Sequence, residues 1–122
     1  MARSVLIVDD HDEFRAAARA VLELDGFVVV GEAADGVEAV VECERLHPDV
    51  VLLDVLLPGE DGFEIARSLV VDGGPAVVLT STRDASAYAR RLAATPARGF
   101  VPKQDLSGET VARILDGEPV NP

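Results

Sequence analysis

Carboxylate side chains follow two largely apolar runs of the sequence at the points where those runs end. The run Val50–Leu53 ends on Asp54, and the run Ser4–Val8 ends on Asp9 and Asp10. Uninterrupted runs of this length are typical of parallel strands that are buried on both faces. Open parallel sheets bind their ligands beyond the carboxyl ends of the strands. The three aspartates are therefore candidates for a site at this edge of the sheet.

Two more runs end on groups that could take part in the same site. Residues 76–79 are followed by Thr80, and residues 99–102 are followed by Lys103. Taken singly, each of these polar residues could be a solvated loop residue. Three neighbouring carboxylates would raise one another's pKa values, however, and a hard divalent cation among them would remove that repulsion. Oxygen ligands suit Mg²⁺, so the sequence predicts a magnesium site with an amine and a hydroxyl nearby.

The elements that must hold these groups alternate between strand and helix periodicity. Short β-branched or apolar runs predict strands over residues 4–8, 27–30, 50–53, 76–79 and 99–102. Apolar residues at helical spacing and capping residues predict helices that begin near Asp12, Asp35, Asp61, Asp84 and Ser107. Five strand–helix units with short connections predict a flavodoxin-like α/β fold, a five-stranded parallel sheet with helices on both faces.

Apolar stripes also predict which side of each helix is buried. The stripes expected to face the sheet are Phe14, Ala17, Ala18, Val21 and Leu22; Val37, Val40, Val41 and Leu46; Ile65, Ala66, Leu69 and Val70; Ala85, Tyr88, Ala89 and Leu92; and Val111, Ile114 and Leu115. The last helix is expected to end at Gly117-Glu118-Pro119.

Length and composition exclude several classes of protein. The 122 residues indicate a single domain over 1–122 with a core of about 3–117. No run is long and apolar enough for a membrane span or a signal peptide, and the single Cys43 fits a reducing, cytoplasmic compartment. The net charge of −11 argues against direct binding of nucleic acids, and the cluster of Arg83, Arg90 and Arg91 belongs to no recognised DNA-reading motif.

The residues that end the strands resemble the set found in the receiver domain of two-component response regulators. The match rests on Asp9-Asp10, Asp54 followed by Pro58-Gly59, Asp61-Gly62, Thr80, and Gly99-Phe100 before Lys103, and it covers essentially the whole chain. The opening Val8-Asp9-Asp10-His11, followed by Phe14-Arg15, is most similar to receivers of the NarL/LuxR subgroup.

The resemblance implies a role for each acidic residue. Asp54 would accept a phosphoryl group from a sensor histidine kinase or a phosphotransfer protein. Asp10 and Asp54 would bind Mg²⁺ directly, Asp9 would act through water, and the backbone carbonyl of Leu56 would fill another position. Lys103 would pair with Asp54 and then with a phosphoryl oxygen.

The resemblance also implies a switch and its readers. Thr80 would turn its hydroxyl to the phosphoryl group, and Phe100 would rotate inward. The surface of the fourth helix, fifth strand and fifth helix would then change for a partner or an attached output domain. A homodimer is one possible partner state. NarL-like receivers usually precede a DNA-binding domain, so we interpret the chain either as a stand-alone receiver or as a domain of a longer protein.

Three alternatives compete with this interpretation. An aspartyl phosphatase would carry a second acid two residues after its nucleophile, where this chain has Leu56, and a receiver is itself no enzyme beyond promoting its own phosphorylation and dephosphorylation. A flavin carrier would need small hydroxyl residues where Asp9-Asp10-His11 stands. A degenerate receiver could be a protein-interaction module that works without phosphorylation.

Pro96, where receivers usually have glycine, predicts a remodelled turn after the fourth helix.

Overall fold

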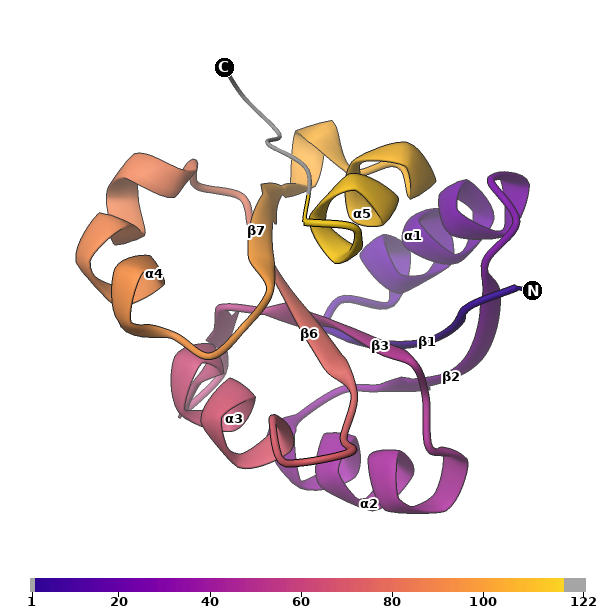
Figure 1. The fold of residues 1–122 in the computed structure, drawn as a ribbon, viewed down its shortest axis with the longest axis horizontal. Helices are drawn as coiled ribbons and strands as arrows, with labels where there is room; N and C mark the ends of the chain where they lie inside the picture. The colour runs from indigo at the N-terminus through magenta and orange to yellow at the C-terminus, as the bar shows by residue number, and fades with distance from the viewer. Residues whose placement is uncertain (1, 118–122) are drawn as a thin grey trace.

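Residues 2–117 are described by the structure, a computed structural model in which five parallel strands form one sheet (Figure 1). The strands are β1 (Ser4–Val8), β2 (Val28–Ala33), β3 (Val50–Asp54), β6 (Ala76–Ser81) and β7 (Gly99–Pro102). Their order in the sheet is β2-β1-β3-β6-β7. The chain therefore adds β2 on one side of β1 and all later strands on the other side, and β1 and β3 lie next to each other at this reversal. The predicted fold class is confirmed.

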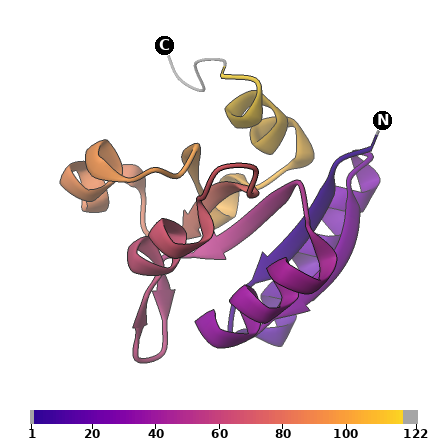
Figure 2. The same ribbon diagram turned by 60° about the horizontal axis from the view of Figure 1, so that its bottom comes forward.

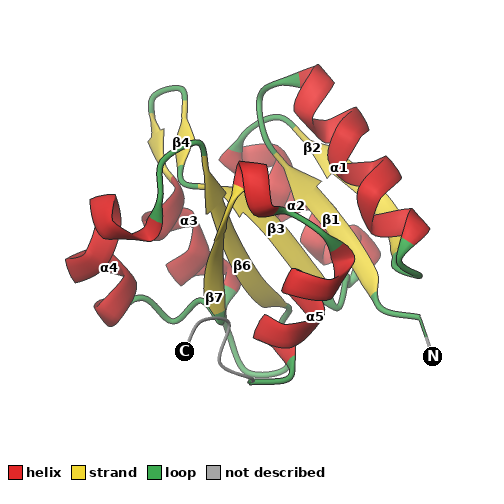
Figure 3. Cartoon of the chain, turned by 90° about the horizontal axis from the view of Figure 1, so that it is seen from above, coloured by secondary structure: helices red, strands yellow, loops and turns green. Residues whose placement is uncertain are grey.

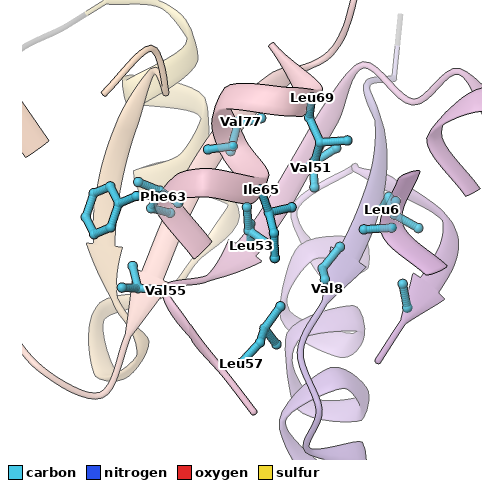
Figure 4. Close-up of a cluster of buried hydrophobic side chains, with 14 residues drawn as sticks. Leu6, Val8, Val51, Leu53, Val55, Leu57, Phe63, Ile65, Leu69 and Val77 are labelled. Atoms are coloured by element: carbon cyan, nitrogen blue, oxygen red, sulfur yellow. The ribbon is translucent and has the colours of Figure 1, made fainter. Parts of the chain in front are cut away.

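Helices cover both faces of this sheet (Figures 1 and 3). One face is covered by α1 (Asp12–Leu24) and α5 (Gly108–Leu115), and the other by α2 (Gly36–Leu46) and α3 (Gly62–Leu69). Successive residues of β3 therefore point into different cores. Val51 and Leu53 belong to the cluster on the α2 and α3 side (Figure 4), whereas Val50 and Leu52 belong to the cluster on the α1 and α5 side. Burial on both faces explains why the strand sequence is continuously apolar.

Side-chain caps fix the starts of three helices where the sequence predicted them. Asp35 accepts a hydrogen bond of 2.8 Å from the amide of Glu38, and Asp61 accepts one of 3.0 Å from the amide of Phe63. Ser107 begins α5 with a reciprocal capping box to Thr110. Such caps satisfy backbone amides that have no partner inside the helix.

The buried stripe of α2 differs from the predicted one. Val37, Val40 and Val41 are exposed, and the helix buries Ala39 completely at the position between them. Gly36, Ala39, Cys43 and Leu46 form the inner side. Gly36 lies close to the hairpin and α3, because a Cβ atom there would meet the ends of the Glu60 and Ile65 side chains. The prediction followed the more hydrophobic valines, but steric fit favours the small residues.

The fourth helix is shorter than predicted. Its first turn is a 3₁₀ turn over Ala85–Tyr88, and α4 itself covers only Ala89–Ala94. Ala85 and Ala89, both expected to face the core, are exposed, and contact with the core runs through Tyr88 and Leu92. Alanine side chains bury too little area to hold the helix closely against the sheet.

Two other segments extend beyond the sequence-based expectation. The strand expected at 27–30 continues through Gly31 to Ala33, with a register shift against β1 between Val5 and Leu6. After Asp54 the chain forms a small antiparallel hairpin, β4 (Leu56–Leu57) and β5 (Glu60–Asp61), which projects from the body of the domain (Figure 2). Gly117 follows α5 as expected, but Glu118 and Pro119 lie outside the described residues. Within residues 2–117, no helix has the length and apolar character required to cross a bilayer.

The hairpin returns to the sheet through a close backbone contact at Gly62. A Cβ atom on Gly62 would lie 2.5 Å from the Asp54 carbonyl oxygen and 2.6 Å from the Val55 Cα atom. Both neighbours are backbone atoms, so they cannot move aside as a side chain would. Only glycine fits where α3 begins against the end of β3.

We expect Gly62→Ala to lower the free energy of unfolding by about 1–3 kcal/mol, the usual cost of overpacking. Urea unfolding would measure this change. Gly31→Ala is the matched control, because its added methyl group meets chiefly the mobile end of the Leu46 side chain. Equal losses in the two variants would contradict the argument that a backbone contact makes Gly62 necessary.

Candidate functional site

The polar groups predicted from the strand ends lie at one edge of the sheet. Asp9 and Asp10 follow β1, and Asp54 ends β3, the neighbouring strand. Thr80 lies on β6 directly beside Asp54 in the strand register. Lys103 follows β7 and reaches back to the aspartates. The parallel sheet therefore brings together all five of these predicted site residues.

The acidic residues form a cluster with the dimensions of a metal site. Asp9, Asp10, His11 and Asp54 each offer one ligand atom, and these atoms all lie within 4.8 Å of one another. Asp9 is fully buried, and Asp54 is 3% exposed. Asp9 Oδ2 and Asp10 Oδ1 are buried atoms without a hydrogen-bond partner. Buried carboxylate oxygens are costly unless a partner compensates them. The Lys103 ammonium compensates Asp9 Oδ2 at 2.6 Å, and a divalent cation would compensate Asp10 Oδ1.

Lys103 lies between the two buried aspartates. Its Nζ atom is 2.6 Å from Asp9 Oδ2, an ion pair without the directionality of a hydrogen bond, and 3.5 Å from Asp54 Oδ2. The pairing with Asp54 that the resemblance implied is thus the longer of two contacts. Lys103 Nζ also lies 4.2 Å from the centre of the Phe14 ring, which provides a cation–π contact.

The two aspartates differ in their affinity for a proton. Burial raises the pKa of Asp54 to about 6, and the Asp9 carboxylate adds to this effect, although the Leu56 amide and Lys103 oppose it. Burial also acts to raise the pKa of Asp9, but Lys103 and the hydrogen bonds from His11 outweigh it and lower that pKa. Lys103 therefore stabilises the charge on Asp9, while the charge on Asp54 is the costly one.

The loop after β3 keeps Asp54 in place. The amide of Leu56 donates a hydrogen bond of 3.1 Å to Asp54 Oδ1. The Leu56 side chain is 52% exposed beside the site. Asp61, at the other end of the hairpin, forms an ion pair with Arg91, whose guanidinium lies over the ring of Phe63.

Arg15 holds the loop that carries the acidic pair, a role that the sequence analysis did not assign. Its Nη1 atom donates a hydrogen bond of 2.5 Å to the backbone carbonyl of Asp9. Its Nε atom donates one of 2.9 Å to Glu32, and its Nη2 atom pairs with Asp12. The available signal was the position of Arg15 one helical turn after the acidic pair, where its long side chain can reach back over the loop.

The hydroxyl of Thr80 is engaged away from the acidic residues. Thr80 is fully buried, and its Oγ1 atom donates a hydrogen bond of 2.7 Å to the carbonyl of Val101. Phe100, the preceding residue of β7, is half-buried against Tyr88, with ring centres 5.9 Å apart. Tyr88 in turn contacts Phe63 at the same spacing. Phe100 thus ends a row of three aromatic rings that leads from α3 to β7.

Comparisons with known proteins agree on one family. Residues 5–115 match the family model for the response regulator receiver domain. The chain is 38% identical over 112 residues to the response regulator GacA of Pseudomonas viridiflava. The aligned segment covers 90% of this chain and 52% of GacA. It is 40% identical over 101 residues to the nitrate/nitrite response regulator protein NarP of Escherichia coli. That alignment covers 81% of this chain and 47% of NarP. The chain therefore spans about half the length of these curated relatives.

Solved structures give the same result. A two-component response regulator of the LuxR family from Aurantimonas superposes with a TM-score of 0.85 at 31% identity, over 97% of this chain and 88% of that one. The response regulator domain of Thermotoga maritima CheB superposes with a TM-score of 0.80 at 25% identity, over the full length of both chains.

The raised pKa of Asp54 predicts how stability depends on pH without metal ions. Between about pH 4 and pH 6 the folded chain holds a proton that the unfolded chain has lost, so stability falls as pH rises through this interval. We expect Asp54→Asn, which removes the buried charge, to be more stable than the parent by about 1–3 kcal/mol at pH 7. This advantage should disappear below about pH 4.

Urea unfolding at a series of pH values would measure the difference. Asp61→Asn is a control for which the expected change in stability has the opposite sign. Burial acts to raise the pKa of Asp61, but Arg91 and two backbone amides outweigh it and lower that pKa. Asp61→Asn should therefore lose stability at pH 7. Equal or lower stability of Asp54→Asn at pH 7 would contradict the assignment of the buried charge.

Proposed function

The chain belongs to the response regulator receiver domain family, and from this we propose that it accepts a phosphoryl group on Asp54. One observation carries the proposal: the Asp54 carboxylate lies within reach of both the acidic pair of β1 and the Lys103 ammonium. The donor would be a sensor histidine kinase or a phosphotransfer protein, because transfer to a carboxylate requires a phosphoryl group that is already activated.

The proposed metal ion is Mg²⁺, held directly by Asp10 and Asp54, through water by Asp9, and by the Leu56 carbonyl. Support comes from the carboxylate cluster and from Asp10 Oδ1, a buried oxygen that has no hydrogen-bond partner. A bound Mg²⁺ would supply positive charge to the phosphoryl oxygens, which the acidic residues would otherwise repel. It would also favour the ionised form of Asp54, whose burial disfavours that form.

The reaction is a displacement at phosphorus. A carboxylate oxygen of Asp54 forms a bond to phosphorus, and the bond from phosphorus to the donor nitrogen breaks, with its electron pair leaving on the donor imidazole. Lys103 then moves from its contact with Asp9 toward a phosphoryl oxygen, acting as a point charge. The chain thereby promotes its own phosphorylation and the later hydrolysis, and it turns over no other substrate.

The proposed switch links the new phosphoryl group to the far edge of the sheet. The Thr80 hydroxyl would exchange its hydrogen bond to the Val101 carbonyl for one to the phosphoryl group. Phe100, on the strand that loses this bond, would then rotate inward from its contact with Tyr88. The surface of α4, β7 and α5 would differ between the two states, and a partner, a second copy or an attached output domain would distinguish them.

The output passes through protein contacts in this proposal. The net charge of −11 opposes direct binding to nucleic acid phosphates. The relatives GacA and NarP are named as response regulators, and this chain covers about half of each. A cytoplasmic location is part of the proposal, because the activated donors are made there.

We expect incubation with acetyl phosphate and Mg²⁺ to add one phosphoryl mass to the parent chain and none to Asp54→Asn. Intact-mass spectrometry would measure this. Asp61→Asn is the matched control: it lies at the end of β5 and keeps its cap, because asparagine also accepts the hydrogen bond from the Phe63 amide. Label on Asp54→Asn at the level of the parent would show that another residue is the acceptor.

We expect the phosphoryl mimic beryllofluoride to change amide hydrogen exchange over residues 85–102 in the parent. Thr80→Val keeps the shape of the side chain without its hydroxyl, so it should bind the mimic but lose most of this change. Thr82→Val, at an exposed position of the following loop, is the control that should respond like the parent. Changes confined to the residues around Asp9 and Asp54 would favour the alternative of an interaction module without a phosphorylation switch.

A further inference from the structure

His11 lies inside the acidic cluster, although it has no part in the site proposed above. It follows Asp10 and occupies the N-cap position of α1, but its side chain makes no capping hydrogen bond. Its imidazole Nδ1 atom instead lies 3.0 Å from Asp9 Oδ1 and 3.3 Å from Asp10 Oδ1. The side chain is 66% exposed, so the imidazole covers the acidic residues from the solvent side.

The distance between His11 Nδ1 and Asp10 Oδ1 is close to the distance between two ligand atoms that bind the same metal ion. Neighbouring ligand atoms of an octahedral ion bound at about 2.1 Å are about 3.0 Å apart. The Nδ1 atom lies 3.3 Å from the carboxylate oxygen of Asp10, close to this spacing, and the candidate ligand atoms of Asp9, Asp10, His11 and Asp54 all fall within 4.8 Å. A cation bound near the loop between β1 and α1 would therefore have carboxylate oxygens and the His11 nitrogen as ligands.

The chemistry of an imidazole changes the class of cation that the cluster prefers. Mg²⁺ is bound by oxygen ligands, and it gains little from a neutral nitrogen. Borderline first-row cations such as Co²⁺ and Zn²⁺ bind imidazole well and carboxylates also. We propose that His11 is a metal ligand that raises the affinity of this site for first-row transition cations relative to its affinity for Mg²⁺. The inference rests on the metal site proposed above, and it adds a ligand and a selectivity to that site.

A tether offers a competing explanation for the same contacts. A protonated Nδ1 could donate to Asp9 Oδ1, as the backbone amide of His11 already does at 2.8 Å. In that case His11 would only orient the carboxylates, and its loss would weaken every cation equally. The two explanations therefore predict different changes in the ratio of Co²⁺ affinity to Mg²⁺ affinity when His11 is replaced.

The experiment compares Co²⁺ and Mg²⁺ binding to the metal-free full chain by isothermal titration calorimetry, with Co²⁺ absorption as a second readout. His11→Asn removes the imidazole but keeps a donor near the Nδ1 position, and asparagine is a favoured N-cap residue. We expect this variant to bind Co²⁺ at least about tenfold more weakly, within the range known for lost metal-site contacts. Its affinity for Mg²⁺ should stay within about twofold.

Two controls locate the bound ion. His47, the other histidine of the sequence, ends α2 in a left-handed conformation (φ 48°) that asparagine tolerates, so His47→Asn should bind both cations like the parent. Asp10→Asn should weaken both cations. A thiolate absorption band that His47→Asn abolishes would place Co²⁺ at Cys43 and His47 instead, and would overturn the proposal.

The remaining outcomes are equally decisive. Equal losses of Co²⁺ and Mg²⁺ affinity in His11→Asn would establish the tether and overturn the ligand. Unchanged Co²⁺ affinity in that variant would overturn both roles. The titration involves no phosphoryl transfer, so an Asp54 that fails to accept a phosphoryl group would refute the proposed function while leaving this result standing.

Discussion

The repulsion between the buried carboxylates of Asp9 and Asp54 constrains the rest of the structure. Both residues are nearly excluded from water, and the Lys103 ammonium lies close enough to contact both. Two buried carboxylates at this edge require the chain to place the one ammonium group accurately between them. The position of Lys103 is set by β7, by the turn that follows it, and by the ring of Phe14. Each of these elements serves the same electrostatic compensation.

A rigid scaffold is needed because the groups come from four different strands. Burial of β1 and β3 on both faces removes freedom from the strand ends, and the backbone contact at Gly62 fixes the chain immediately after Asp54. Arg15 adds a second fixed point by binding the Asp9 carbonyl. By contrast, residues 85–94 contact the core through few large side chains, chiefly Tyr88 and Leu92. The candidate site residues therefore lie at the ends of well-buried strands, whereas α4 has a much smaller contact with the core.

Sequence patterns predicted the strands well because a strand buried on both faces has a distinctive composition. The convergence of Asp9, Asp54, Thr80 and Lys103 followed from strand order alone. The face of α2 was predicted wrongly at Val37 and Val40, because periodicity weights these residues by hydrophobicity, whereas the helix buries the smaller Gly36 and Ala39. The contacts of His11 and Arg15 depend on the course of the loop after β1, which no periodic signal specifies.

Lys103 is the only lysine in the sequence, since all other cationic side chains except histidine are arginines. Its side chain is 13% exposed, and its Nζ atom contacts Asp9. Reagents that modify side-chain amines therefore have a single target in this chain, and that target lies in the acidic cluster. Acylation requires an amine nitrogen that is free to attack the reagent, whereas the Lys103 nitrogen contacts the Asp9 carboxylate. Modification of the lysine side chain consequently reports on the acidic cluster alone, and lysine-directed crosslinking gives no information about the other surfaces of the domain.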